Sequence, residues 1–348
     1  ISALGYGMWT PKMPGQRGLR ILCLDGGGTR GVLTVTLLKK IMSSLGKEPF
    51  EVFDLICGTS TGGILATLFV CNRMSMQKAS KLYDDLIIKI FTKIPWLSNF
   101  MLVKDQALYP DGPWESILKG FLSENKRLID IEDNPLAPKL AMCSTIMNID
   151  PLQMMVWRSY NYPIGTAPIH KGSFRNKVWE AVRATTAAPT YFKPLKSEGV
   201  LYGDGALLAN NPTAFAISEA KLLFPSIPIE AVISIGTGYQ EPTLKPAAEA
   251  GWFTIVNQVV NSATDTETVH TTLRSLLPED RYFRFNPEIE AFPIDETNPD
   301  RLLYLKERAK EYFSEESPDR IRLEQLWKLL RGVDSEIGSD ASFGTWNE

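Results

Sequence analysis

The sequence predicts an α/β fold in which helices cover a parallel β-sheet. Two consecutive strand–turn–helix units support this prediction, the first over residues 19–45 and the second over residues 52–70. Strand-like and helical segments continue to alternate up to about residue 240. The chain has 348 residues, of which 44% are hydrophobic, so it can bury a sizeable core.

The spacing of apolar residues defines each element of the two units. Residues 19–24 form an apolar run that is typical of a buried strand, and residues 32–45 carry apolar side chains at helical spacing before Gly46. Residues 52–57 predict a second short strand, and the nearly all-apolar residues 62–70 predict a helix buried on most sides. Both strands are therefore expected to lie in one parallel sheet.

The rest of the chain predicts further elements of both kinds. Strands are predicted over residues 139–144, 154–159 and 231–235. A helix is predicted over residues 212–223, and helical segments follow residue 240, the clearest over residues 317–332 between the cap Ser317 and the stop Gly332.

These elements predict one folded domain over residues 17–332, with a core over 17–240 and a C-terminal extension over 241–332. Residues 1–16 are expected to be a lead-in. Residues 333–348 have no apolar period and predict a disordered tail.

Composition excludes some partners and favours a compartment. The net charge of −3 lacks the basic excess that binding to a phosphate backbone needs, so nucleic acid is not an expected partner. The four cysteines form no CxxC pair, and three lie in apolar runs, so we interpret them as reduced thiols. No stretch has the order of a signal peptide or the length of a membrane span. We expect an intracellular protein, cytosolic or peripheral on an organelle membrane.

The segment GTSTG, residues 58–62, lies directly between a predicted strand and a predicted helix. In a nucleophile elbow of this form the serine occupies a sharp turn, and flanking glycines, here Gly58 and Gly62, let the chain bend without a Cβ clash. This position predicts that Ser60 is a nucleophile presented at a helix N-terminus. The alternative is an ordinary Gly/Ser/Thr turn that caps a helix, since the GxSxG pattern often occurs by chance.

The segment DGGGTRG, residues 25–31, also lies between a strand and a helix. Consecutive glycines leave backbone N–H groups open to an anion, which suits a tetrahedral oxyanion, and Arg30 adds positive charge. The loop also matches the dinucleotide fingerprint GxGxxG, with Glu48 or Glu51 near the distance expected of the ribose-binding acid. Against that alternative, a dinucleotide site has no use for a nucleophile elbow on the neighbouring strand.

A serine nucleophile needs a base, and the chain has only two histidines, His170 and His270. Neither follows a predicted strand in a glycine-rich turn, so both are interpreted as surface residues. Without a histidine, a carboxylate must take the proton directly.

Asp204 is the candidate base. It ends a short strand-like run and has a glycine on each side, in the segment LYGDGA of residues 201–206. The alternative is a type I′ or II′ turn, for which Asp-Gly is among the commonest dipeptides. The presence of an elbow serine without a histidine partner favours Asp204 as the base.

Four motifs together resemble one family. DGGGTRG, GTSTG, ATTAAPTYFKP at residues 184–194 and GDGALLANNP at residues 203–212, in this order, resemble the patatin-like phospholipases, closest to calcium-independent phospholipase A2 of the gamma type. The aspartate motif reads DGA where many relatives have DGG. The resemblance implies a three-layer α/β/α sandwich with a mainly parallel central sheet and a Ser60–Asp204 dyad. It implies oxyanion donors among the amides around Gly26, Gly27, Gly28 and Arg30.

The resemblance also implies a function. We expect hydrolysis of fatty acyl esters of membrane phospholipids, which gives free fatty acid and lysophospholipid, without a metal or another cofactor. Two alternatives stay open: a neutral-glyceride lipase or acyltransferase with the same dyad, and a nucleotide-binding module that uses the glycine loop.

Residues 87–103 mix apolar, aromatic and lysine side chains in a way that suits docking at a lipid headgroup interface. Residues 87–90 are better explained as part of a core helix. Beyond Pro95 the pattern predicts a peripheral membrane interface formed by Trp96, Leu97, Phe100 and Met101.

Overall fold

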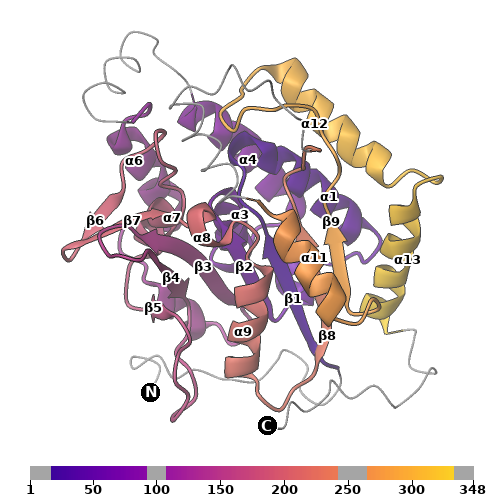
Figure 1. Ribbon diagram of the computed structural model, residues 1–348, viewed down its shortest axis with the longest axis horizontal. Coiled ribbons are helices and arrows are strands. Elements are labelled where there is room, and N and C mark those ends of the chain that lie inside the picture. The colour runs from indigo at the N-terminus through magenta and orange to yellow at the C-terminus, as the bar shows by residue number, and fades with distance from the viewer. Residues whose placement is uncertain (1–16, 92–106, 242–264, 333–348) are drawn as a thin grey trace.

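A mainly parallel central sheet is the framework of the molecule (Figure 1). The computed structural model describes residues 17–91, 107–241 and 265–332. The nine-stranded sheet has the order β5–β4–β3–β2–β1–β8–β9, and the β6–β7 hairpin joins it through β7 and β3. The strands are β1 Leu19–Leu24, β2 Leu55–Thr59, β3 Lys139–Ile146, β4 Gln153–Arg158, β5 Lys171–Ser173, β6 Leu195–Ser197, β7 Val200–Asp204, β8 Ile229–Ile235 and β9 Tyr282–Phe285.

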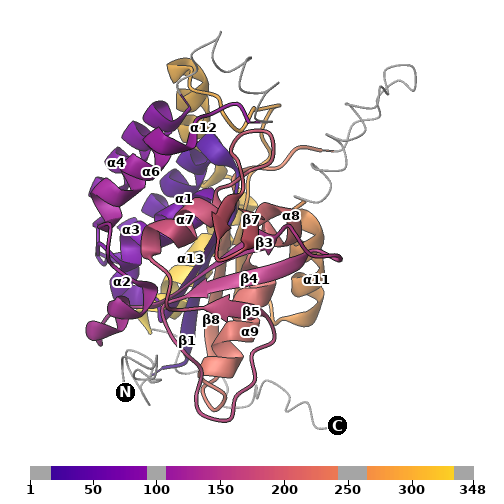
Figure 2. The same cartoon turned by 90° about the vertical axis from the view of Figure 1, so that its left-hand side faces the viewer.

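Helices cover both faces of this sheet and make the three-layer α/β/α sandwich that the sequence predicted (Figures 1 and 2). One face packs against α1 Gly31–Ser43, α3 Thr61–Val70, α4 Met76–Ile90, α6 Asp111–Leu122, α7 Val178–Thr185, α12 Pro299–Tyr312 and α13 Pro318–Arg331. The other face packs against α9 Thr213–Leu223 and α11 Glu267–Leu276. Short helical segments are η2 Gly28–Arg30, α2 Pro49–Val52, η3 Leu128–Asp133 and α8 Ala206–Ala209.

Strand β1 shows why apolar runs become central strands here. All its residues are buried, with alternate side chains packed into the two helical layers. Parallel pairing joins it to β2 on one edge and to β8 on the other, so both faces and both edges are covered. The sequence of a strand that is buried on both faces is a nearly continuous apolar run rather than an alternation of apolar and polar residues.

The predicted helices form close to their expected bounds, and the last of them ends as its capping residues require. Ser317 accepts a hydrogen bond of 3.3 Å from the amide of Asp319, and Gly332 adopts the left-handed conformation that stops α13. Ile87 and Ile90 are buried on α4, as expected of a core helix.

Two predictions of local structure are wrong. Val52 does not begin the second strand, because Pro49 and the capping box between Glu48 and Glu51 start helix α2, and β2 begins only at Leu55. The chain after residue 240 is not only helical, because β9 extends the sheet next to β8. Its four residues, YFRF, are too few to give a clear strand signal.

Some predictions fall outside the described residues. These are the lead-in 1–16, the tail 333–348 and the interface residues Trp96, Leu97, Phe100 and Met101. Within the described part of the chain, none of the helices has the length and apolarity needed to cross a membrane.

Candidate active site

Ser60 forms the turn between strand β2 and helix α3. Its φ of 51° lies in a region that favours glycine, so the backbone is strained at this residue. The flanking glycines make the turn sterically feasible. A Cβ atom on Gly58 would collide with the carbonyl group of Gly62, and one on Gly62 would collide with the carbonyl group of Leu24.

Thr185, at the end of α7, stabilises this strained turn through two hydrogen bonds. Its hydroxyl accepts a hydrogen bond of 2.9 Å from the amide of Ser60 and donates one of 2.5 Å to the carbonyl of Cys143 on β3. Thr185 is completely buried. Thr185 belongs to the motif of residues 184–194, but the motif does not indicate this role, because only the fold brings α7 next to the elbow.

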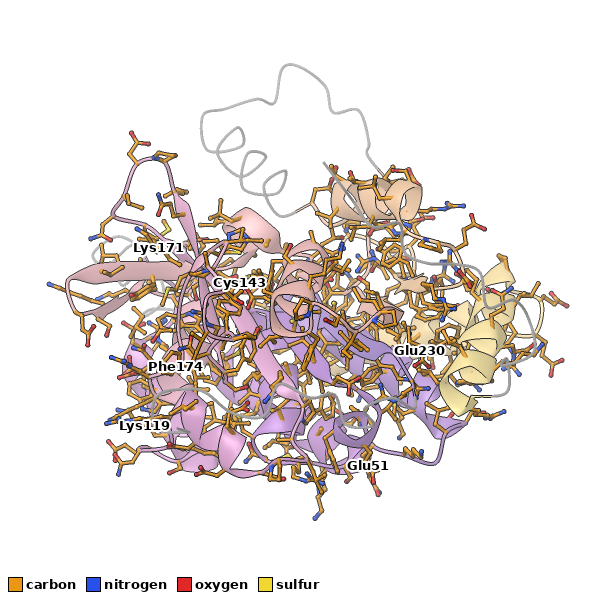
Figure 3. All side chains as sticks on the ribbon, turned by 90° about the horizontal axis from the view of Figure 1, so that it is seen from below. Glu51, Lys119, Cys143, Lys171, Phe174 and Glu230 are labelled. Carbon is orange, nitrogen blue, oxygen red and sulfur yellow. The ribbon has the colours of Figure 1, made fainter. Side chains whose placement is uncertain are left out.

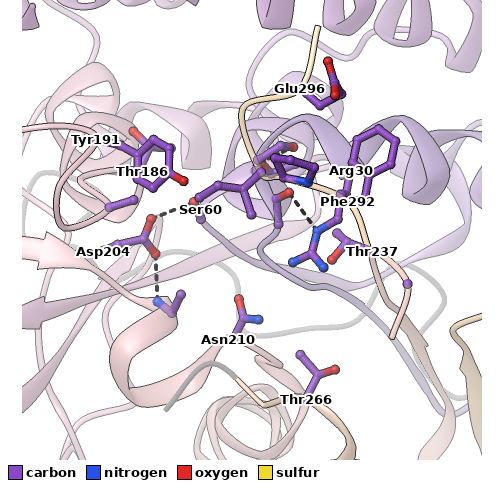
Figure 4. Close-up of a pocket in the computed structure, with 18 of the residues that line it drawn as sticks. Arg30, Ser60, Thr186, Tyr191, Asp204, Asn210, Thr237, Thr266, Phe292 and Glu296 are labelled. Atoms are coloured by element: carbon purple, nitrogen blue, oxygen red, sulfur yellow. Dashed lines mark hydrogen bonds between the residues drawn. The ribbon is translucent and has the colours of Figure 1, made fainter. Parts of the chain in front are cut away.

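The sheet brings Ser60 and Asp204 together because the carboxyl ends of β2 and β7 meet on one edge of β3. Strand β4 occupies one edge of β3 over residues 141–146. On the other edge, β2 ends where Thr59 pairs with Cys143, and the antiparallel β7 ends where Asp204 pairs with the next residue, Ser144. The carboxyl ends of the two strands therefore face each other, and the Ser60 hydroxyl donates a hydrogen bond of 2.7 Å to Asp204 Oδ2 (Figure 4).

The surroundings of Asp204 suit a base that works near neutral pH. Its side chain is only 2% exposed, and its other oxygen accepts a hydrogen bond of 2.8 Å from the amide of Ala206. Burial raises the pKa of Asp204 to about 7, although the hydrogen bonds from Ala206 and Ser60 act in the opposite direction. The carboxylate can therefore take a proton from a hydroxyl and return it at physiological pH.

The two histidines lie apart from this pair. His170 and His270 are half-buried residues. His270 Nδ1 lies 3.1 Å from the hydroxyl of Tyr282, on the α9–α11 side of the sheet. Neither histidine is among the described residues that line the cavity around Ser60.

The glycine loop after β1 runs beside Ser60, and its amides differ in what they bind. The amide of Gly26 donates to the carbonyl of Asn210 at 3.2 Å, and the amide of Arg30 donates to the carbonyl of Gly27 at 3.2 Å. In the described part of the chain, the amides of Gly27 and Gly28 have no acceptor, and both residues line the cavity. Among the predicted oxyanion residues, the loop therefore presents two open donors, the amides of Gly27 and Gly28.

A buried ion pair anchors the start of this loop. Asp25 is completely buried, and its Oδ2 lies 2.7 Å from Arg284 Nη2 on β9. The same guanidinium group lies 2.9 Å from Glu267 Oε1 at the start of α11. Burial raises the pKa of Asp25 to about 6, and the charge of Arg284 opposes that rise. Arg284 was not predicted as part of the site, because no local pattern connects residue 284 to residue 25.

The structure does not support the dinucleotide interpretation of the loop. Glu48 and Glu51 cap helix α2, where Glu51 accepts a hydrogen bond of 2.7 Å from the amide of Glu48. Glu48 and Glu51 precede β2, whereas the glycine loop follows the parallel strand β1. The two glutamates therefore lie at the amino ends of the strands, and the loop lies at the carboxyl ends. Glu51 is exposed at the margin of the molecule, and Cys143 lies in its interior (Figure 3).

Ser60 and Asp204 open into a cavity of about 1620 Å³ with two different walls. The apolar wall comes from α3, α4, α6 and the segment after α7: Ile64, Ile87, Ile90, Phe91, Trp114 and Phe192. The polar wall includes the buried Asn210 and Thr237 and the exposed Gln240, Thr268, Thr271 and Thr272. The Arg30 guanidinium group also lines the cavity, and its Nε donates to the carbonyl of Gly27 at 3.3 Å (Figure 4).

The described residues contain no group of three or more His, Cys, Asp and Glu side chains arranged to hold a metal ion. All four cysteines are free thiols, and Cys23, Cys57 and Cys143 are buried. This burial agrees with their interpretation as small apolar residues.

An elbow serine that is hydrogen-bonded to a buried carboxylate, in an α/β/α sandwich, is the arrangement expected of an acyl hydrolase. Comparison with known proteins agrees with this class. The model of the patatin-like phospholipase family matches residues 22–217. The chain therefore belongs to the patatin-like phospholipase family.

Individual relatives cover most of this chain. Calcium-independent phospholipase A2-gamma from Mus musculus is 38% identical over 299 residues, which is 85% of this chain and 38% of the mouse protein. Phospholipase A I from Arabidopsis thaliana is 33% identical over 87% of this chain and 27% of its own length. Among solved structures, human GIVD cytosolic phospholipase A2 aligns with a TM-score of 0.45 and 9% identity, over 90% of this chain and 60% of that one. The chain thus spans well under half of the length of the mouse and Arabidopsis relatives.

Proposed function

We propose that this chain hydrolyses fatty acyl esters of glycerophospholipids with a Ser60–Asp204 dyad and releases free fatty acid and lysophospholipid. One contact supports this proposal above all. The Ser60 hydroxyl, on a strained elbow, donates a 2.7 Å hydrogen bond to a carboxylate that is 2% exposed. The phospholipase relatives favour the same substrate class.

In the first half of the reaction Asp204 accepts the proton of Ser60 while Ser60 Oγ attacks the ester carbonyl carbon. The open amides of Gly27 and Gly28 donate to the oxygen that becomes negatively charged. When the tetrahedral intermediate collapses, the glycerol oxygen leaves with the proton from Asp204, and the acyl group stays on Ser60. In the second half, Asp204 accepts a proton from water while the water oxygen attacks the acyl carbon. The bond from the acyl carbon to Ser60 Oγ then breaks, Asp204 returns the proton to Ser60 Oγ, and the fatty acid is released.

The two walls of the cavity suit the two parts of a phospholipid. The apolar wall provides a surface for the acyl chain, where burial of each CH₂ group contributes about 0.8 kcal/mol. We assign the headgroup to the polar wall and Arg30, since a guanidinium group is suited to phosphate. Peripheral association with a membrane, and an intracellular location for it, are part of the same proposal.

The test uses purified protein with vesicles of defined phospholipid, in the presence and absence of EGTA. We expect release of fatty acid and lysophospholipid that is insensitive to the chelator, and Ser60→Ala should lower kcat by roughly 10⁶-fold. A fluorophosphonate probe should label the native protein and fail to label the variant. Faster release of fatty acid from triacylglycerol emulsions than from phospholipid would favour a neutral-glyceride lipase instead. Activity in Ser60→Ala within tenfold of the native rate would remove Ser60 from the mechanism.

A further inference from the structure

We infer that Thr237 is a positioning residue of the oxyanion hole: its hydroxyl holds the carbonyl of Gly26 and thereby aims the amide of Gly27 at the reacting oxygen. This inference rests on the proposed function. Thr237 Oγ1 donates a hydrogen bond of 2.9 Å to Gly26 O. Thr237 follows β8, is 3% exposed and lines the cavity.

The planarity of the peptide bond connects this hydrogen bond to catalysis. The carbonyl of Gly26 and the N–H of Gly27 belong to one peptide unit, and in a trans peptide they point in opposite directions. A donor that fixes the carbonyl on one side therefore fixes the direction of the N–H on the other side. Because glycine has no side chain to restrict this peptide, its orientation depends on such external contacts.

The neighbouring peptide unit is held in the same manner. The carbonyl of Gly27 accepts hydrogen bonds from the amide and the Nε of Arg30, at 3.2 and 3.3 Å, and these contacts fix the N–H of Gly28. Arg30 belongs to the loop itself, whereas Thr237 lies two residues beyond the end of β8. Thr237 therefore provides the contact that sets the first open amide relative to the fixed framework.

Thr237 is itself held firmly enough to act in this way. On one side, the amide of Gly236 donates to the carbonyl of Phe285 at 2.9 Å, and on the other the amide of Gly238 donates to Asn286 Oδ1 at 2.7 Å. Its side chain also packs directly on the loop, since a Cβ atom on Gly27 would overlap it. The hydroxyl is thus anchored to the sheet at the point where the loop passes.

The experiment compares Thr237→Val, which keeps the shape and loses the donor, with Thr237→Ser, which keeps the donor. In phospholipid hydrolysis we expect Thr237→Val to lower kcat by about 10- to 100-fold, with KM changed by less than about threefold. Thr237→Ser should retain kcat within about threefold of the native protein. A trifluoromethyl ketone analogue, which forms an oxyanion on Ser60, should bind Thr237→Val more weakly by the same factor as kcat falls. An ether-linked phospholipid, which lacks the carbonyl, should bind both variants as it binds the native protein.

Thr67→Val is the matched control, because Thr67 is also completely buried and its hydroxyl donates to a glycine carbonyl, that of Gly63, at 2.7 Å. Thr67 lies two turns into α3 and outside the cavity lining, so its variant should keep native kcat. The inference is overturned if Thr237→Val keeps kcat within threefold, if Thr237→Ser is equally impaired, or if ether phospholipid and ketone lose affinity together. An active Ser60→Ala would instead overturn the proposed function.

Discussion

Replacing Asp204 by Asn should stabilise the protein at alkaline pH while abolishing its activity. Asn fits the same space, its Oδ1 can accept the hydrogen bond from the amide of Ala206, and its amide group can donate to Ser60 Oγ. Both contacts of the carboxylate are therefore kept, with one direction reversed. What disappears is the buried negative charge and the ability to accept a proton.

The size of the stabilisation follows from the pKa of Asp204. A pKa raised by burial from 3.8 to about 7 corresponds to about 4 kcal/mol. The sign follows from linkage: because the folded-state pKa lies above the unfolded one, the protonated carboxyl favours folding, and this contribution is lost as pH rises toward 7. The advantage of Asp204→Asn should therefore be absent below pH 3.8, grow through acidic pH and level off above about pH 7.

Denaturant unfolding of the native protein and the variant at pH 5 and pH 8 measures this difference. We expect the free energy of unfolding to favour the variant by about 3 kcal/mol more at pH 8 than at pH 5. At the same time kcat should fall by at least about 10⁴-fold. Asp280→Asn provides the matched control, because it makes the same substitution at a carboxylate whose side chain is 73% exposed. An equal gain for Asp204→Asn at both pH values would refute a raised pKa for Asp204.

Three further predictions concern catalysis. Since Asp204 must be ionised to accept a proton and burial raises its pKa to about 7, kcat/KM should rise about tenfold per pH unit below pH 7 and level off above it; a pH–rate profile that is flat between pH 5 and 8 would contradict this role. The double variant His170→Gln, His270→Gln should keep native turnover, and a collapse of activity in a folded double variant would restore a histidine base. Gly27→Ala should lower kcat far more than it changes KM, because a Cβ atom there would overlap Thr237 and displace an open amide; steady-state kinetics in which KM alone changes would be inconsistent with that geometry.

Local sequence was sufficient where a single segment determines its own structure. The apolar runs of β1 and β8 and the capped ends of α13 require no knowledge of the rest of the chain. The elbow is local in the same sense. Gly58 and Gly62 are needed because the turn brings the chain within contact distance of itself and of β1. The GxSxG pattern places glycines at these two positions, so the sequence alone indicates the turn.

Local sequence was insufficient wherever a short element depends on a distant partner. Strand β9 has only the residues 282–285, and it is a strand because the exposed edge of β8 binds it. Which amides of the glycine loop stay open depends on distant partners in the same way. The acceptor of the Gly26 amide is the carbonyl of Asn210, which no pattern around residues 25–31 reveals.

The sequence by itself determined the type of fold, the position of Ser60 on an elbow and the presence of a glycine-rich loop beside it, because these features depend on residues close together in the chain. Only the tertiary structure decided that Asp204 meets Ser60, since β7 runs against β2 along one edge of β3, 144 residues further along the chain. The tertiary structure also decided the chemistry of that carboxylate. Its raised pKa is a consequence of burial between packed layers, and burial is a property of the folded molecule rather than of any segment.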